Sequence, residues 1–214
     1  MNNGVRFGDK HSIDDWDLLM TSKSIGEAKP KTNYIQIEGR DSSLDLTEAL
    51  GEVKFEDRDL SFEFDMFQSS NAWWELKKKI SNYLNGRRLK VVLDQDPNYY
   101  YDARLQVDNF SHDKTVGHIS ISGMAKPYKY KKEVTVITHE VIAGNSYTFT
   151  NARKSVVPTL NLSANMTIKF NGVSYSLNAG QQKVLDIKFV EGINTIEVTT
   201  GSGTLTATYQ EADL

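Results

Sequence analysis

The chain has 214 residues, a formal net charge of -3 and a pI near 5.8, and its 25 basic and 28 acidic residues are interspersed. No basic face or polybasic run therefore indicates binding to nucleic acid or to an anionic membrane. Cysteine is absent, which excludes disulfides, thiolate metal sites and cysteine nucleophiles and is typical of folding in a reducing cytoplasm.

The length suits one large all-β domain or two smaller ones, each able to bury its own core. The first residues contain no apolar stretch of signal-peptide length, and the longest apolar run, residues 91–93, is far too short to span a bilayer. We therefore expect no membrane insertion and no use of the general secretory route. A site of action outside the cell would require release within an assembly or by lysis.

The first half of the chain reads as a β-rich segment. Period-two alternation and turn residues predict strands over residues 33–38, 53–55, 60–67, 89–93, 99–107 and 118–125. The clearest is 60–67, where Leu60, Phe62, Phe64 and Met66 alternate with polar residues, so that one face is buried.

The segment Gly39–Leu50, with the sequence GRDSSLDLTEAL, fits neither a buried element nor a solvated loop. It opens with turn formers, and then Leu44 and Leu46 alternate with Asp45 as in a half-buried strand. It is either a hairpin loop with two anchoring leucines or an arm whose partner lies elsewhere.

One helix is expected from about Ala72 to Leu84, followed by an Asn-Gly stop. Its apolar residues fall on one face, as in a helix that packs on a sheet, and they are Trp73, Leu76, Ile80, Tyr83 and Leu84. A lysine triplet, Lys77–Lys79, lies toward solvent. The simplest reading of the triplet is a solvated face, and a border to a channel or a partner is the alternative.

A change of composition near residues 126–133 predicts a domain boundary. All three tryptophans lie before it, whereas Thr, Ser, Asn and Gly dominate after it, and Pro127 is unable to donate a backbone hydrogen bond to a neighbouring strand. We therefore expect a first domain over residues 1–130 and a second over 131–214.

The second domain is expected to be a β-sandwich. Short β-rich runs separated by turn signals predict strands at 134–141, 146–150, 158–162, 166–170, 173–177, 183–189, 192–199 and 204–209. Asn171-Gly172 is the strongest hairpin signal, because type I′ turns need positive φ at both central residues. About eight strands without a helical period indicate a sandwich of jelly-roll type.

No constellation in the sequence supports catalysis, a cofactor or a metal. The four histidines lack metal-ligand spacing, and His112 and His118 with Asp113 between them form only a weak metal signal. No GxSxG, GxxxxGK[ST] or GxGxxG motif is present. The protein is therefore not expected to be an enzyme.

Carboxylates surround a tyrosine triplet at residues 99–101, which superficially suggests a glycosidase or a sugar platform. A glycosidase needs two carboxylates at a defined separation across a cleft, which sequence spacing does not establish. Turn chemistry explains Asp94 and Asp96 more economically, since both belong to the DQDPN turn of residues 94–98. Asp102, beyond the tyrosines, completes the group.

Several segments, agreeing in order and spacing, resemble the distal tail protein (Dit) family of long-tailed bacteriophages (siphoviruses) and prophage tails. They cover residues 1 to about 130 and comprise Phe7–Ser12, Gly39–Leu50, Arg58–Phe64, Tyr83–Gly86, Asp96–Tyr101 and Pro127–Tyr130. Beyond residue 130 the resemblance is one of architecture alone.

This resemblance implies a structural virion protein at the distal end of a phage tail, made in the cytoplasm of the bacterial host. Its fold would be mainly β, with a barrel-like or split-sheet N-terminal domain that carries one helix and an extended arm, and a C-terminal galectin-like β-sandwich. Six copies would form a ring that joins the tail tube protein to the tail-tip or baseplate hub, a protein like the tail-associated lysin. Tape measure and receptor-binding proteins are further expected partners, and DNA would leave through the lumen without specific binding.

Ring closure gives the Gly39–Leu50 segment a role, because a cyclic assembly docks one patch onto a different patch of the next copy. An arm could pair with a neighbour's sheet edge through backbone hydrogen bonds and two apolar anchors. The candidate subunit-interface residues are Arg40, Asp41, Leu44, Asp45 and Leu46.

The alternative function is a carbohydrate-binding module that contacts host cell-wall glycans. Sugar sites usually present an aromatic platform, and the second domain offers few candidates between Tyr147 and Tyr209. Most of these occupy alternating strand positions that a core would use.

Overall fold

A computed structural model describes residues 3–49, 51–67, 70–113 and 116–214, without the side chains of residues 70 and 71. The chain divides into two compact units, Met1–Lys129 together with Leu214, and Tyr130–Asp213. Each unit is built from antiparallel β-structure, and each has a hydrophobic core of its own.

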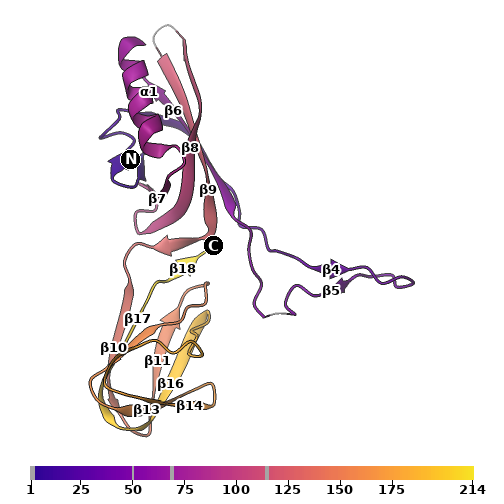
Figure 1. The fold of residues 1–214 in the computed structure, drawn as a ribbon, viewed down its shortest axis with the longest axis vertical. Coiled ribbons are helices and arrows are strands. Elements are labelled where there is room, and N and C mark those ends of the chain that lie inside the picture. The colour runs from indigo at the N-terminus through magenta and orange to yellow at the C-terminus, as the bar shows by residue number, and fades with distance from the viewer. Residues whose placement is uncertain (1–2, 50, 68–69, 114–115) are drawn as a thin grey trace. The chain divides into compact units, whose positions relative to one another are not determined.

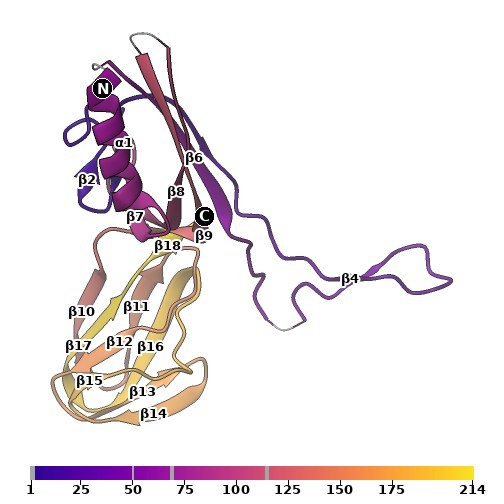
Figure 2. The same cartoon turned by 45° about the horizontal axis from the view of Figure 1, so that its top comes forward.

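Seven strands of the first unit form one antiparallel sheet in the order β2-β1-β7-β8-β9-β6-β3. Their bounds are β1 (Val5–Phe7), β2 (Lys10–His11), β3 (Leu19–Ile25), β6 (Arg58–Met66), β7 (Arg88–Leu93), β8 (Tyr99–Asp113) and β9 (Val116–Lys131). β6, β7, β8 and β9 are labelled in Figures 1 and 2. The strands predicted at 60–67, 89–93, 99–107 and 118–125 are confirmed in β6, β7, β8 and β9. β8 and β9 extend well beyond the predicted ranges, and they are neighbours in the sheet.

Among the described residues there is one α-helix, α1 (Ser70–Leu84). It confirms the predicted helix and starts two residues earlier. Trp73, Ile80 and Leu84 are fully buried against the sheet, as the apolar stripe indicated. The Tyr83 hydroxyl donates to the carbonyl oxygen of Phe7 at 3.0 Å, which ties the end of the helix to β1. No helix in the described part of the chain is long and apolar enough to cross a membrane.

Aromatic rings from distant parts of the sequence meet beneath this helix. Phe7 lies 5.5 Å from Phe62 and 6.3 Å from Phe64, both in edge-to-face geometry, and Trp16 stacks on Phe7 at 6.0 Å. Burying each such ring stabilises the unit by about 1.5–3 kcal/mol. The core thus forms where β1, β6 and α1 converge.

The second unit is a jelly roll of two four-stranded sheets, in the orders β10-β17-β12-β15 and β11-β16-β13-β14. The strands are β10 (Thr135–Ile142), β11 (Asn145–Asn151), β12 (Thr159–Leu162), β13 (Met166–Phe170), β14 (Val173–Leu177), β15 (Gly180–Gln182), β16 (Gly192–Thr200) and β17 (Ser202–Tyr209). A short strand, β18 (Ala212–Asp213), follows. The predicted mainly-β sandwich fold is confirmed.

In this unit the predicted Asn171-Gly172 turn is present, whereas the strand predicted at 183–189 is wrong. Asn171 and Gly172 both have positive φ, 48° and 84°, as a type I′ turn requires. The predicted strand at 183–189 is instead an irregular segment after β15, and Phe189 forms an isolated bridge with Val156. Its apolar residues alternate as in a strand, but the chain turns back on itself between Val184 and Ile187.

Candidate subunit interface

A long hairpin leaves the sheet between β3 and β6, and residues 26–57 are here called the arm (Figure 1). Its base is closed by backbone hydrogen bonds from Gly26 to Asp59 at 2.8 Å and from Glu56 to Lys29 at 2.8 Å. Farther out, β4 (Tyr34–Ile35) pairs with β5 (Leu44–Asp45). The arm carries the Gly39–Leu50 segment, whose last residue, Leu50, lies outside the described residues.

Two strands predicted in this region were wrong in extent. The strand predicted at 33–38 is reduced to β4, and the one predicted at 53–55 is replaced by an isolated bridge between Phe55 and Pro30. The physical reason is that, among the described residues, β4 and β5 form a sheet of two strands with no third strand beside it. A two-stranded ribbon alone is marginally stable, so only a short ladder forms.

Local hydrogen bonds hold the outer part of the arm in shape. Near the tip, the Arg40 N–H donates to the Ile37 carbonyl at 3.1 Å, and Gly39 takes the positive φ of 79° that this turn needs. Behind it, an Asp45 carboxylate oxygen accepts from the Thr47 N–H at 2.9 Å. Hydrogen bonds from the Thr47 side chain and backbone lower the pKa of Asp45, which keeps this carboxylate charged.

The arm has one apolar face that its own unit leaves uncovered. Ile35 lies directly opposite Leu44 in the ladder, so both side chains point to the same side, and Ile37 and Leu46, two residues farther along each strand, extend that side. Ile35, Ile37 and Leu44 remain 46%, 44% and 38% exposed. None of these aliphatic side chains belongs to the core of the unit or packs against it.

All five predicted interface residues lie on the arm. Leu44 and Leu46 are on its apolar face, Asp45 is on the opposite face across from Tyr34, and Arg40 and Asp41 are near the tip. Ile35 and Ile37 were missed as candidates. Their signal was present in the sequence, because Ile-Gln-Ile has the same period of two as Leu-Asp-Leu.

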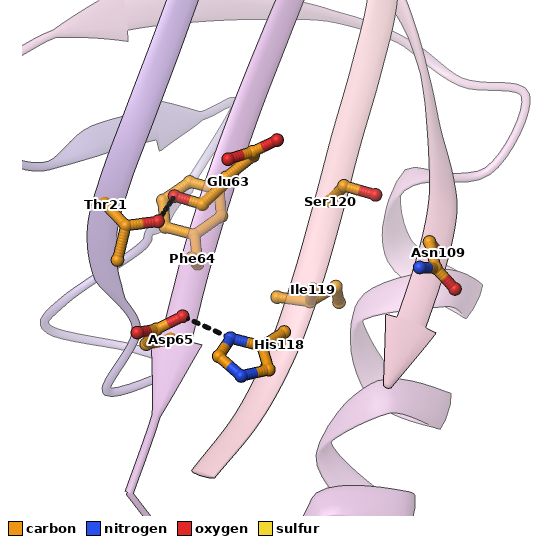
Figure 3. A pocket seen from close by; sticks show the side chains of 8 residues that line it. All are labelled: Thr21, Glu63, Phe64, Asp65, Asn109, His118, Ile119 and Ser120. Carbon is orange, nitrogen blue, oxygen red and sulfur yellow. Dashed lines mark hydrogen bonds and ion pairs between the residues drawn. The ribbon is translucent and has the colours of Figure 1, made fainter. Parts of the chain in front are cut away.

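A shallow cleft of about 270 Å³ lies on the sheet of the first unit, lined by residues of β3, β6, β8 and β9 (Figure 3). In it, His118 Nδ1 lies 2.6 Å from an Asp65 carboxylate oxygen. The Thr21 hydroxyl donates to the Glu63 carbonyl, and no hydrogen bond among the described residues links Ser120 to the histidine. A histidine–carboxylate pair identifies a catalytic site only when the histidine also contacts a nucleophile, so this pair does not indicate a particular reaction.

The two histidines that gave the weak metal signal, His112 and His118, have separate partners. His112 packs against the Trp73 ring at 4.9 Å, whereas His118 pairs with Asp65. In residues 3–49, 51–67, 70–113 and 116–214, no cluster of three or more His, Asp or Glu side chains has a geometry that suits a metal ion.

The three carboxylates around the tyrosine triplet each have separate partners. Asp94 pairs with His11 at 3.1 Å, and Asp96 pairs with Lys129 at 3.0 Å. Asp102 accepts from Arg88 at 2.8 Å and from Lys126 at 2.5 Å. Partial burial raises the pKa of Asp102, but these two cations outweigh burial, so that its pKa lies below the ordinary value.

The aromatic side chains available for a sugar platform in the second unit belong to its core. Phe149, Phe170, Phe189 and Tyr209 are at most 3% exposed, and Tyr147 and Tyr175 are half-buried against them. The Tyr209 hydroxyl donates to the Thr150 carbonyl, and burial raises its pKa to about 12. None of these rings is presented as an open stacking surface.

Comparison with solved structures finds a similar fold in a phage protein. The crystal structure of SPP1 Dit (gp 19.1), described as a paradigm of the hub adsorption apparatus in phages that infect Gram-positive bacteria, superposes with a TM-score of 0.71. The match covers 100% of both chains at 13% sequence identity. No family model and no curated protein matches the sequence. The chain therefore has a Dit-like fold, and the resemblance in fold inferred from its sequence motifs is confirmed.

Proposed function

We propose that this chain is a distal tail protein of a tailed bacteriophage or prophage tail, and that six copies form a ring at the end of the tail tube. Its role is structural rather than catalytic. The likeness in fold to SPP1 Dit over the whole length of both chains supports this proposal. The motifs shared with the Dit family in residues 1–130 support it independently.

In this proposal the two units have different roles. The first unit, residues 1–130, closes the ring and contacts the tail tube protein and the tail-tip hub. The second, residues 131–214, is a galectin-like jelly roll that faces outward, toward the receptor-binding parts. DNA leaves through the lumen, and the net charge of -3 suits a passage that should not retain a polyanion.

The observation that carries the proposal is the uncovered apolar face of the arm. Four aliphatic side chains share one side of a hairpin that makes no core contact in its own chain. A soluble protein gains from covering such a surface, and a ring supplies the cover through heterologous contacts, because every copy gives one arm and receives another. The charged side chains of Arg40, Asp41 and Asp45 would pair with opposite charges around that contact and so fix its register.

Imaging tests the proposal most directly. The full-length protein, alone and mixed with the tail tube protein and the hub protein of the same tail, is examined by negative-stain electron microscopy and by light scattering after size exclusion. We expect ring-shaped particles with a central hole and the mass of six copies. A protein that stays monomeric at high concentration, and in the presence of both partners, would refute the ring.

A further inference from the structure

A second exposed apolar surface lies on α1, outside the arm. Trp74 is 54% exposed, and its ring lies 5.5 Å from that of Phe110 on β8. The Lys77 ammonium group stands 5.2 Å from the Trp74 ring and 5.8 Å from the Phe110 ring. These residues with Lys78 are called the α1 patch. Trp74 belongs to neither the core nor the side chains packed against it.

The α1 patch is positively charged. Lys77, Lys78 and Lys79 follow one another on the helix, which carries a single acidic residue, Glu75. In the part of the chain that the structure describes, no carboxylate lies within ion-pair distance of any of these three lysines. Lys77 is held over two aromatic rings, so its ammonium group is already positioned for an anionic partner.

The arm has the opposite charge. Between Asn33 and Ala49 it carries one basic residue, Arg40, and four acidic residues, namely Glu38, Asp41, Asp45 and Glu48. An apolar face with an acidic rim fits an aromatic surface with a basic rim, since unlike charges favour the encounter and fix the register.

The α1 patch differs from other exposed apolar side chains of the first unit in the charged residues beside it. Leu19, 53% exposed, lies opposite Asp65 in the sheet register, and Phe67 follows Asp65 by two residues. Met124, 56% exposed, lies opposite Asp59 and lines a cleft that also contains Arg104, so the charges beside it are mixed. An acidic arm would meet like charge beside Leu19 and Phe67, whereas at the α1 patch three lysines outnumber the two nearby acidic residues, Glu75 and Asp108.

We propose that the α1 patch of one copy receives the apolar face of the arm of a neighbouring copy. This inference rests on the proposed ring and names the surface that accepts the arm. The reach is sufficient, because Ile35 lies nine residues beyond Gly26 and an extended residue spans about 3.3 Å. This places the apolar face roughly 30 Å from the base of the arm, about the width of a small domain.

Because the contact is heterologous, its two halves can be removed separately. Leu44→Asp with Leu46→Asp removes the arm half, and Trp74→Ala with Lys77→Glu removes the patch half. Each variant alone should assemble at least about tenfold more weakly than the wild type, as expected for loss of a central aromatic and a charge. Phe67→Ala, which removes a similarly exposed ring beside acidic residues, is the matched control and should assemble normally.

Mixing the two full-length variants gives the decisive measurement. The intact arm of the Trp74 variant can dock on the intact patch of the Leu44 variant, and no second contact is available to either copy. Light scattering should therefore show heterodimers in the mixture and no ring, while each variant alone stays monomeric. A mixture without heterodimers would overturn the proposal.

The outcomes distinguish this inference from the proposed function. If the wild type forms rings and the Trp74→Ala, Lys77→Glu variant forms them equally well, the ring stands and the arm docks elsewhere. If the wild type with its partners never forms a ring, both proposals fail. Should the Trp74 variant lose its fold, Lys77→Glu with Lys78→Glu tests the same surface. Rescue of that variant by Asp41→Lys is then the expected result, and its absence refutes the contact.

Discussion

Replacing Leu44 and Leu46 together by aspartate should yield a folded chain that no longer forms a ring. Both residues lie on the arm and outside the core, so the free energy of unfolding should change by no more than about 0.5 kcal/mol. Within the copy-to-copy contact the effect is larger. Covering a leucine that is about two-fifths exposed contributes roughly 1 kcal/mol, and each buried unpaired carboxylate costs about 1–3 kcal/mol more.

The expected loss is therefore at least about 3 kcal/mol for each contact, which corresponds to more than a hundredfold weaker association. Light scattering after size exclusion should give the mass of one copy for the variant, and circular dichroism should give an unchanged melting curve. Leu185→Asp is a matched control, because Leu185 is 76% exposed on the second unit. A double-aspartate variant that still elutes as a hexamer would refute the assignment of this face to the subunit contact.

Three further predictions concern the stability of the units. Asp102→Asn should reduce the stability of the first unit at neutral pH and flatten the acid side of its pH–stability curve. A carboxylate whose pKa is lowered by folding stabilises the protein above about pH 4 and loses that effect as the pH falls through its folded pKa. An unchanged acid side would contradict this. Arg58 is 4% exposed, its Nε and Nη2 find no hydrogen-bond partner among the described residues, and its guanidinium lies 5.6 Å from the centre of the Tyr101 ring. Because a methionine can keep the packing on that ring without a buried charge, Arg58→Met should melt at the same temperature or higher, and a loss of more than about 1 kcal/mol would show that the guanidinium is stabilising. Gly172→Val places a β-branched residue at φ 84° and should destabilise the second unit by about 1–3 kcal/mol, measured by thermal unfolding with Val173→Thr as control.

The second unit was largely predictable from sequence because its determinants are local. β13 and β14 match their predicted ranges at both ends, since the Asn-Gly turn between them fixes the register and alternation fixes the buried face. β15 was missed for the converse reason. Its Gly-Gln-Gln sequence has no apolar alternation, and it is a strand because β12 lies beside it.

The first unit shows what alternation does not reveal. β3 has a mainly polar sequence, LMTSKSI, and was not expected as a strand; it forms because β6 offers a free edge. On the arm, Ile35 and Leu44 each alternate with polar residues along their own strand, as residues of a buried face do, yet both remain exposed. A period of two says that one side of a strand is apolar, and says nothing of which chain covers that side.

The same limit applied to Trp74. The helical stripe predicts that Trp73 is buried, as it is, and assigns no role to Trp74, the next residue around the helix. Only the spatial neighbours, Phe110 and Lys77, make Trp74 part of a surface. Sequence order separates these residues by up to 36 positions, so no local pattern connects them.

One arm and one patch per copy also bear on whether the assembly closes. An open row of copies leaves one arm and one patch uncovered at its ends, whatever its length. A closed ring covers both, and the closing contact joins two ends that are already held together, so it forms without the entropy cost of bringing in another copy. A heterologous contact between arm and patch therefore favours a ring over an open filament whenever the rotation between neighbours allows closure. The angle at which the arm leaves the sheet, between Ile25 and Arg58, would then set the number of copies.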